Sequence, residues 1–265
     1  MKIEFYKYHG TGNDFIIIDN RDLRWIPDHQ QVAFLCNRHL GVGSDGLMLL
    51  SNVVGFDFGM TYFNSDGNES TLCGNGGRCL TAFARLLGII DTKARFHAID
   101  GEHEAFILNE SDKITHIKLK MRNVVVEEPV GENFFIDTGS PHYIIFSTNV
   151  NRLDIVKKAR KIRYDTCFAE EGTNVDFVEV KNDHLFVRSY ERGVEDETLS
   201  CGTGITASAL AAAVKTPGNP GFFEIKTRGG ELKVSYKQEE NVFTDIWLEG
   251  PAEMVFRGEI ELEDR

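Results

Sequence analysis

The 265-residue sequence has little of what marks disordered, fibrous, secreted or membrane-spanning proteins. It contains only 6 prolines and no polar tract, which excludes a collagen-like or disordered chain. It has no signal-peptide pattern and no apolar run of about 20 residues, so we expect a cytoplasmic protein with no membrane partner. Its 5 cysteines are odd in number and lack C-x-x-C spacing, which argues against a disulfide framework and the common metal sites.

Basic residues are scarce relative to acidic ones. The sequence has 29 Lys and Arg against 41 Asp and Glu, which gives a formal net charge of −12. The densest basic run lies at residues 157–163 and has no interleaved aromatic residues, so it is predicted to be a solvated helix face. We therefore expect no nucleic-acid partner.

An internal repeat organises the chain. Four short motifs recur in the same order at offsets of 127–129 residues: Thr11-Gly12 with Thr138-Gly139, Gly43-Ser44-Asp45 with Gly172-Thr173-Asn174, Tyr62 with Tyr190, and Cys73-Gly74-Asn75-Gly76 with Cys201-Gly202-Thr203-Gly204. Their shared order and spacing predict two homologous lobes. The boundary is predicted near residues 120–122, between strand-like runs at 114–119 and 124–126.

Each lobe is predicted to contain short strands and one apolar helix. Residues 77–87 carry a helical apolar stripe that ends at Gly88. Residues 205–214 are apolar nearly all round, and Pro217-Gly218 should end that helix. A helix of this kind must be buried, so we predict an α/β (α+β) fold in which a mostly antiparallel sheet or barrel wraps around a central helix in each lobe. Peripheral helices are expected at 27–40 and 152–163.

Cys73 and Cys201 each precede a glycine-containing turn that opens a predicted helix. Unpaired N–H groups and the positive end of the helix dipole favour a thiolate at this position and can also bind a carboxylate. The alternative for a single cysteine is a small buried hydrophobic residue, which is our interpretation of Cys36 and Cys79. The duplication at matched positions favours a functional role for Cys73 and Cys201.

Other polar residues gather at the repeated motifs. These residues are Asn13, Asn64, Asn75, His142, Asn174, Glu191 and Arg192. Taken singly, each is typical of a turn or of a solvated ion pair. The segment Gly41–Gly46 matches G-x-G-x-x-G by letter. It follows a predicted helix and enters a predicted strand, which is the wrong context for a dinucleotide site.

Together these motifs resemble the diaminopimelate epimerase family. The resemblance spans nearly the whole chain and rests on Gly12-Asn13-Asp14-Phe15, Tyr62-Phe63-Asn64-Ser65-Asp66-Gly67, Cys73-Gly74-Asn75-Gly76, Thr173-Asn174-Val175-Asp176-Phe177, Tyr190-Glu191-Arg192-Gly193 and the run from Glu197 to Gly204. It implies two pseudo-symmetric lobes, residues 1–121 with 251–265 and residues 122–250, and an active site in the cleft between them. The implied reaction is the epimerisation of L,L-diaminopimelate to the meso form for lysine and peptidoglycan precursors, without pyridoxal phosphate, another cofactor or a metal.

The resemblance also implies roles for individual residues. Cys73 and Cys201 would be the acid and base pair, which suits a stereoinversion that needs one on each face of the carbon. Backbone N–H groups of Gly74, Asn75, Gly202 and Thr203 would bind the carboxylate on the reacting carbon. The distal end of the substrate would be held by Asn13, Asn64, Asn174 and Arg192. Glu191 would lie near the ammonium group and, with His142, would tune the pKa of a cysteine.

Two residues depart from the family pattern. Ser140 stands where Asn is common before Pro-His, which predicts a weaker contact with substrate, and Gly46 stands where some members have Gln. Two alternatives stay open: a racemase or isomerase of the same fold that acts on another amino acid such as proline or hydroxyproline, and a non-catalytic carboxylate-binding protein. We expect a small amino-acid substrate and a homodimer. A disulfide between Cys73 and Cys201 in an oxidised sample would abolish activity.

Overall fold

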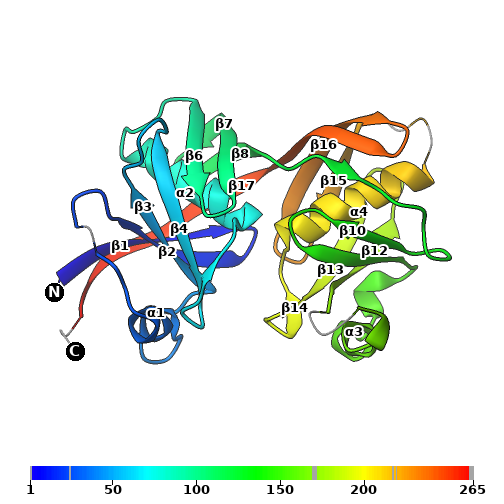
Figure 1. Ribbon diagram of the computed structural model, residues 1–265, viewed down its shortest axis with the longest axis horizontal. Coiled ribbons are helices and arrows are strands. Elements are labelled where there is room, and N and C mark those ends of the chain that lie inside the picture. The colour runs from blue at the N-terminus through cyan, green and yellow to red at the C-terminus, as the bar shows by residue number, and fades with distance from the viewer. Residues whose placement is uncertain (1, 24, 169–171, 217, 219, 263–265) are drawn as a thin grey trace. The chain divides into compact units, whose positions relative to one another are not determined.

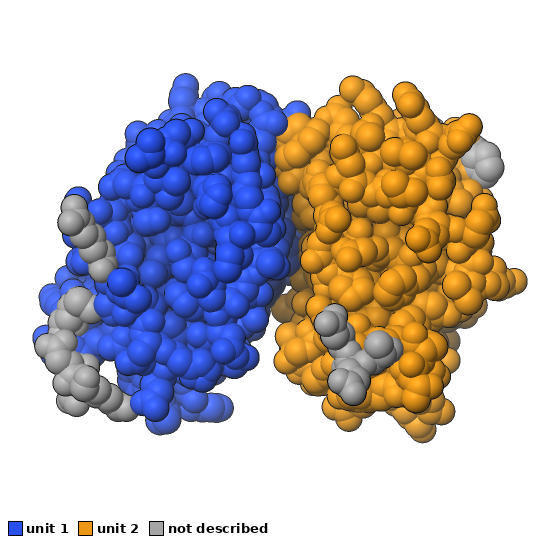
Figure 2. All heavy atoms as spheres, viewed as in Figure 1, with its two compact units in different colours: residues 1–119, 250–265 blue, residues 120–249 orange. Residues whose placement is uncertain are grey.

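The computed structural model describes residues 2–23, 25–168, 172–216, 218 and 220–262 (Figure 1). The predicted helix stop at Pro217 lies outside these residues. The chain divides into two compact units, residues 1–119 with 250–265 (unit 1) and residues 120–249 (unit 2), coloured blue and orange in Figure 2. Both are sheet-rich α/β structures, which confirms the predicted fold class. None of the helices within the described ranges is long and apolar enough to cross a membrane.

Unit 1 is a closed barrel around one helix. Its elements are β1 (Lys2–Gly10), β2 (Asn13–Asp19), α1 (His29–Cys36), β3 (Gly46–Ser51), β4 (Phe58–Asn64), β5 (Glu69–Ser70), α2 (Gly74–Leu86), β6 (Lys93–Ala98), β7 (Gly101–Ser111), β8 (Ile114–Lys120) and the second part of β17 (Val242–Glu261). Neighbouring strands pair in the order β1-β2-β3-β4-β6-β7-β8-β17 and back to β1, and only β2–β3 and β4–β6 are parallel. Every residue of α2 from Gly74 to Ala84 is buried, as expected for a helix that fills a barrel.

Unit 2 repeats this plan with one opening. Its elements are β9 (Val124–Val125), β10 (Phe134–Asp137), β11 (Pro141–Phe146), α3 (Ile155–Arg163), β12 (Asn174–Val180), β13 (Leu185–Glu191), β14 (Asp196–Thr198), α4 (Gly202–Lys215), β15 (Phe222–Lys226), β16 (Glu231–Glu239) and the first part of β17, with short 3-10 turns at Val150–Arg152 and Thr166–Phe168. Pairing runs β9-β17-β16-β15-β13-β12-β11-β10, and the described residues form no ladder between β9 and β10. Nearly all of α4 is buried.

The two peripheral helices are shorter than predicted. Helix α1 begins after the N-cap Asp28, in a capping box with Gln31, and ends at Cys36 instead of Leu40. It ends early because Asn37 is extended and its side-chain oxygen accepts the backbone N–H groups of His39 and Leu40. Helix α3 begins after the N-cap Asp154, because residues 150–152 form a 3-10 turn instead of the first helical turn.

The strand registers correct two matches in the predicted repeat. Phe15 pairs with Gly46 as His142 pairs with Asn174, so Gly46 corresponds to Asn174, and the predicted match of Asp45 to Asn174 is wrong by one residue. Tyr62 pairs with Met48 across β3 and β4, whereas Ser189 pairs with Asp176 across β12 and β13. Met48 and Asp176 hold equivalent positions, since each approaches the third residue of the central helix, Gly76 or Gly204. Tyr62 therefore corresponds to Ser189, and its predicted match to Tyr190 is wrong by one residue. A one-residue shift in a strand turns the side chain to the opposite face.

Candidate active site

In each unit the ends of three strands surround the first turn of the central helix. In unit 1, β2 and β3 begin and β4 ends at this edge, and Cys73 is the N-cap of α2. In unit 2, β11, β12 and β13 have the same arrangement around Cys201, the N-cap of α4. The predicted site residues therefore gather into two groups. Half-site 1 comprises Asn13, Asn64, Cys73, Gly74 and Asn75; half-site 2 comprises Ser140, His142, Asn174, Glu191, Arg192, Cys201, Gly202 and Thr203.

Half-site 1 is ordered by two asparagine side chains. The Cys73 thiol donates to Asn13 Oδ1 over 3.4 Å, and Asn75 Nδ2 donates to the same oxygen over 3.3 Å. Arg78 Nη2 donates to Asn75 Oδ1 over 2.9 Å, while Asn13 Nδ2 donates to Asp45 Oδ2 over 2.7 Å. The Arg78 guanidinium can only donate, which fixes the orientation of the Asn75 amide. The Asp45 carboxylate can only accept, which fixes the orientation of the Asn13 amide. Asn13 consequently presents an acceptor to the sulfur.

Arg78 is a fully buried cation beneath this half-site. Its side chain donates to the backbone oxygens of Gly74 and Pro251 as well as to Asn75. Within the part of the chain that the structure describes, no carboxylate lies within ion-pair distance of it. Burial lowers the pKa of Arg78 to about 10, so the guanidinium is still protonated at neutral pH.

Asn13 is held by an ion-pair cluster of Lys7, Asp14, Arg38 and Asp45, which it contacts through Asp45. Asp45 accepts from Arg38 over 2.7 Å, and Arg38 also contacts Asp14 over 2.7 Å. Lys7 lies 2.6 Å from Asp14. Burial would raise the pKa of Asp14, but the hydrogen bonds from Arg38 and Lys7 outweigh it and lower the pKa to about 2. Asp14 is thus ionised at neutral pH.

Half-site 2 contains a continuous line of polar contacts that ends at the cysteine. Cys201 Sγ lies 3.4 Å from Thr203 Oγ1, which lies 2.9 Å from His142 Nε2. His142 Nδ1 lies 2.6 Å from Asp176 Oδ2, and both of these side chains are fully buried. Ser189 donates to the other oxygen of Asp176. The sequence placed His142 and Thr203 in the site but not Asp176 or Ser189.

The pKa of Cys201 lies well above its usual range. Burial of the thiol is the largest cause, and the negative charges of Glu191 and Asp176 act in the same direction. The hydrogen bond with Thr203 and the one from the Gly204 backbone lower the pKa by less. Cys201 is therefore a neutral thiol in this state.

Ser140, Asn174 and Arg192 of half-site 2 are joined by hydrogen bonds. Asn174 donates through Nδ2 to Ser140 Oγ and to the Pro141 carbonyl, each over 2.8 Å. Its Oδ1 accepts the backbone N–H of Arg192 over 2.9 Å. Thr198 donates to Glu191. The shorter Ser140 side chain therefore orients Asn174 in this state.

Gly46 is required by the packing of β3 against β4. A Cβ at this position would lie 2.5 Å from Tyr62 Cε2 and 2.6 Å from the Phe63 carbonyl oxygen. No larger side chain fits while Tyr62 keeps this position. The Tyr62 ring thus occupies the space that a side chain at position 46 would need.

Two central-helix glycines provide a paired test of the polar line in half-site 2. Gly76→Ala and Gly204→Ala change the same helical position. Alanine loses less backbone entropy on folding than glycine, which contributes about 0.5–1 kcal/mol of stability in both variants. The new Cβ would lie 2.1 Å from the flexible Met48 Cε in one case and 2.5 Å from Asp176 Oδ1 in the other. Met48 can turn aside, whereas Asp176 is held by His142 and Ser189. We expect Gly204→Ala to be less stable than Gly76→Ala by about 1–3 kcal/mol in urea unfolding. Equal stabilities would show that Asp176 is free to move.

Sequence reasoning missed Arg78 and Asp176, although each has a recognisable signal. Arg78 stands on the predicted helix 77–87 directly before its apolar stripe. Asp176 interrupts the apolar strand Val175-Asp176-Phe177-Val178. A charged residue inside a buried element needs partners, which makes it a candidate for a supporting role.

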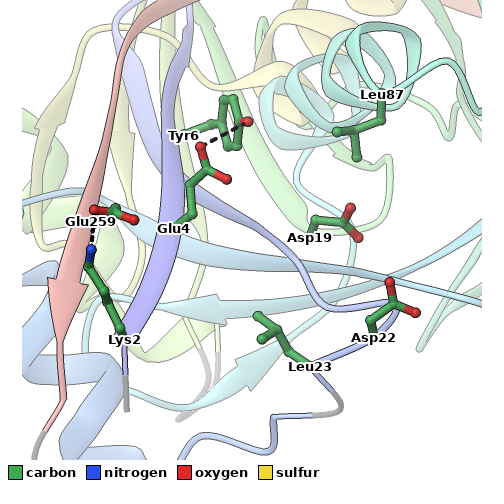
Figure 3. A pocket seen from close by; sticks show the side chains of 8 residues that line it. All are labelled: Lys2, Glu4, Tyr6, Asp19, Asp22, Leu23, Leu87 and Glu259. Atoms are coloured by element: carbon green, nitrogen blue, oxygen red, sulfur yellow. Dashed lines mark hydrogen bonds and ion pairs between the residues drawn. The ribbon is translucent and has the colours of Figure 1, made fainter.

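A separate shallow pocket of about 390 Å³ lies in unit 1 (Figure 3). Its lining carries the carboxylates of Glu4, Asp19, Asp22 and Glu259, and Lys2 lies 2.6 Å from Glu259. Leu87 also lines the pocket. It is the C-cap of α2, so it lies about 20 Å along the helix from Cys73 at the N-cap. None of the predicted site residues lines this pocket.

Solved structures with the same duplicated fold define the structural class. A Bacillus anthracis phenazine biosynthesis protein of the PhzF family superposes with a TM-score of 0.78 at 15% identity, covering 99% of this chain and 100% of that one. A probable proline racemase from Agrobacterium radiobacter K84 gives 0.72 at 15% identity, covering 98% and 93%. This class consists of proteins with two helix-filled, sheet-rich lobes.

Sequence comparisons then identify the family. The family described as diaminopimelate epimerase matches residues 5–126 and 134–255, two segments of equal length. The diaminopimelate epimerase of Flavobacterium psychrophilum is 50% identical over 258 residues, covering 96% of this chain and 98% of that protein. The enzyme of that name from Chlorobaculum tepidum is 40% identical, covering 96% and 99%. The chain belongs to the diaminopimelate epimerase family, as its motifs predicted.

Proposed function

We propose that this chain epimerises L,L-diaminopimelate to the meso form, a step towards lysine and peptidoglycan precursors. The duplicated cysteine N-cap carries the proposal. Cys73 and Cys201 occupy the same position on α2 and α4, in a chain whose relatives are named diaminopimelate epimerases. Family membership alone would not point to particular atoms, and this repeated position supports the choice of the two sulfurs.

The two sulfurs are the acid and the base of the proposed reaction. A thiolate removes the α-proton from one face, and a thiol delivers a proton to the other face of the resulting carbanion. The high pKa of Cys201 favours Cys201 as the initial acid, which leaves Cys73 as the initial base. The reverse reaction exchanges these roles. Because the two thiols must differ in protonation, we expect a bell-shaped dependence of kcat/KM on pH.

The helix N-termini supply the groups that stabilise the carbanion. N–H groups in the first turn of a helix have no partner within the helix. We assign those of Gly74, Asn75, Gly202 and Thr203 to the carboxylate on the reacting carbon, where negative charge grows as the proton leaves. For the distal end of the substrate we propose Asn13, Asn64, Asn174 and Arg192, with Glu191 at its ammonium group. The proposal requires both half-sites to bind the same substrate molecule.

Proton NMR of the reduced protein with L,L-diaminopimelate in deuterium oxide tests this function directly. We expect the α-hydrogen signal to decay as deuterium replaces it, with the meso form appearing in parallel. Proline and hydroxyproline serve as comparison substrates. Exchange with one of these and none with diaminopimelate would indicate a racemase of another amino acid. Binding of diaminopimelate without any exchange would indicate a carboxylate-binding protein.

The proposed chemistry also bears on location and assembly. The proposed mechanism requires the thiols of Cys73 and Cys201 to stay reduced. We therefore infer a reducing compartment and assign the protein to the cytoplasm. We propose a small amino acid as its partner, with no role for nucleic acid or a membrane. The homodimer stays a prediction, which sedimentation equilibrium would test.

A further inference from the structure

The polar line behind Cys201 has only one consistent arrangement of protons when the imidazole is neutral. An ionised carboxylate only accepts hydrogen bonds, so His142 donates to Asp176 through Nδ1 over 2.6 Å. His142 Nε2 then accepts from the Thr203 hydroxyl over 2.9 Å. Thr203 Oγ1 in turn accepts from the Cys201 thiol over 3.4 Å. The three donors point in one direction, from sulfur to carboxylate.

This arrangement allows the thiol to lose its proton without releasing it to solvent. We propose that Asp176 is a positioning residue that fixes the Nδ1–H tautomer of His142, and that the Thr203 hydroxyl relays a proton between Cys201 and His142 Nε2. This inference rests on the proposed function and assigns the relay to the step in which Cys201 acts as a base.

The relay step balances without another reactant. The Cys201 S–H bond breaks as its proton bonds to Thr203 Oγ1, while the original hydroxyl proton of Thr203 bonds to His142 Nε2. The products are a thiolate and an imidazolium, and the imidazolium is paired with Asp176. The reverse shift returns the proton to sulfur. The relay therefore creates a thiolate together with its counter-charge, which a buried site otherwise disfavours.

The charges around the relay come from two strands. Asp176 on β12 and Glu191 on β13 act on Cys201, and both are negative. Several other charged groups on the strands around α4 pair elsewhere: Asp137 with Arg122, Glu179 with Lys181, Arg188 with Glu197, Lys226 with Glu231, and Lys233 with Glu224. His142 is linked to Cys201 by hydrogen bonds through Thr203, so the imidazolium that the relay creates lies one hydroxyl group away from the thiolate.

Half-site 1 shows that the fold does not require these polar residues. Phe15 pairs with the first residue of β3 as His142 pairs with the first residue of β12. Met48 corresponds to Asp176, since each meets the third residue of its helix. The first copy thus fills the same space with apolar side chains. Burying a carboxylate and an imidazole in the second copy has a stability cost that packing alone does not explain.

Thr203→Val and Thr203→Ser form the central test, because valine keeps the shape of threonine and serine keeps the hydroxyl. The rate of Cys201 alkylation by iodoacetamide is followed against pH by peptide mass spectrometry, and kcat/KM is followed with diaminopimelate. We expect serine to act within about threefold of the wild type. Valine should lower both rates about 10²-fold near neutral pH and move the alkylation inflection to higher pH. Equal behaviour of Val and Ser would overturn the relay.

Asp176→Asn tests the positioning role separately. Nitrogen-15 NMR of labelled His142 should show the proton on Nδ1 in the wild type and a mixture of tautomers in the variant. A proton on Nε2 in the wild type would refute the assignment. If Asp176→Asn does not fold, the Thr203 pair still decides the relay. Alkylation needs no substrate, so a hydroxyl-dependent Cys201 in a protein without epimerase activity would reject the proposed function and keep the relay.

Discussion

Cys73→Ala and Cys201→Ala are each expected to lower kcat/KM for epimerisation by about 10²–10⁴-fold, the contribution typical of a positioned acid or base. Each variant keeps the helix N-terminus that binds the carboxylate but loses proton transfer on one face. Inversion needs both faces, so neither remaining thiol can substitute for the other. Conversion of L,L-diaminopimelate to the meso form, followed by NMR, gives the rate for each variant.

Cys167→Ala is the matched control for these two variants. Cys167 is also a free thiol but lies exposed in a 3-10 turn and is not a helix N-cap. We expect it to epimerise at the wild-type rate. Thermal unfolding of all three variants separates loss of chemistry from loss of fold. If Cys73→Ala or Cys201→Ala inverted the substrate at the wild-type rate, the two-base assignment would be wrong.

Arg78→Ala is expected to destabilise the protein by about 3–5 kcal/mol, the range found when the largest core side chains are truncated. Arg78 is the bulkiest of the fully buried side chains, so its removal leaves a large cavity in unit 1. It also removes the donors to Asn75, Gly74 and Pro251. Urea unfolding measures the loss, provided the slope of the transition is unchanged.

Two further arginine variants separate the causes. Arg78→Met restores most of the volume but no donors, so we expect it to recover part of the stability without restoring the orientation of Asn75. Arg85→Ala removes an arginine from the same helix, where it pairs at the surface with Asp91 and Glu110. Surface pairs contribute about 0–1 kcal/mol, so Arg85→Ala should have little effect. Comparable losses for Arg78→Ala and Arg85→Ala would contradict a supporting role for the buried cation.

Much of the fold could be predicted because it depends on local patterns. The all-round apolarity of residues 205–214 required a buried helix, and α4 is buried along nearly its whole length. Gly88, which follows the predicted helix 77–87, indicated the end of α2, and the helix ends at Leu86. Boundaries were less predictable where a side chain competed with the backbone. Asn37 ended α1 four residues early by accepting N–H groups that a longer helix would have used.

Local patterns also indicated the candidate site, because its cysteines lie in motifs that repeat. Cys73 and Cys201 are the N-caps of α2 and α4, the position that the Cys-Gly-x-Gly turns predicted. Asn13, Asn75, His142 and Thr203 are hydrogen-bonded around these caps. The supporting residues were harder to find, since Arg78 and Asp176 act through partners that are distant in sequence.

The sequence by itself determined the duplication, the two central helices, the cysteine N-caps and the family, because each depends on residue order or on short-range spacing. Only the tertiary structure decided how the two copies differ. Strand register places Met48 against Gly76 and Asp176 against Gly204, and a shift of one residue reverses which side chains face the helix. Spatial proximity, which sequence spacing does not encode, makes one cysteine the neighbour of an asparagine pair and the other the end of a proton relay.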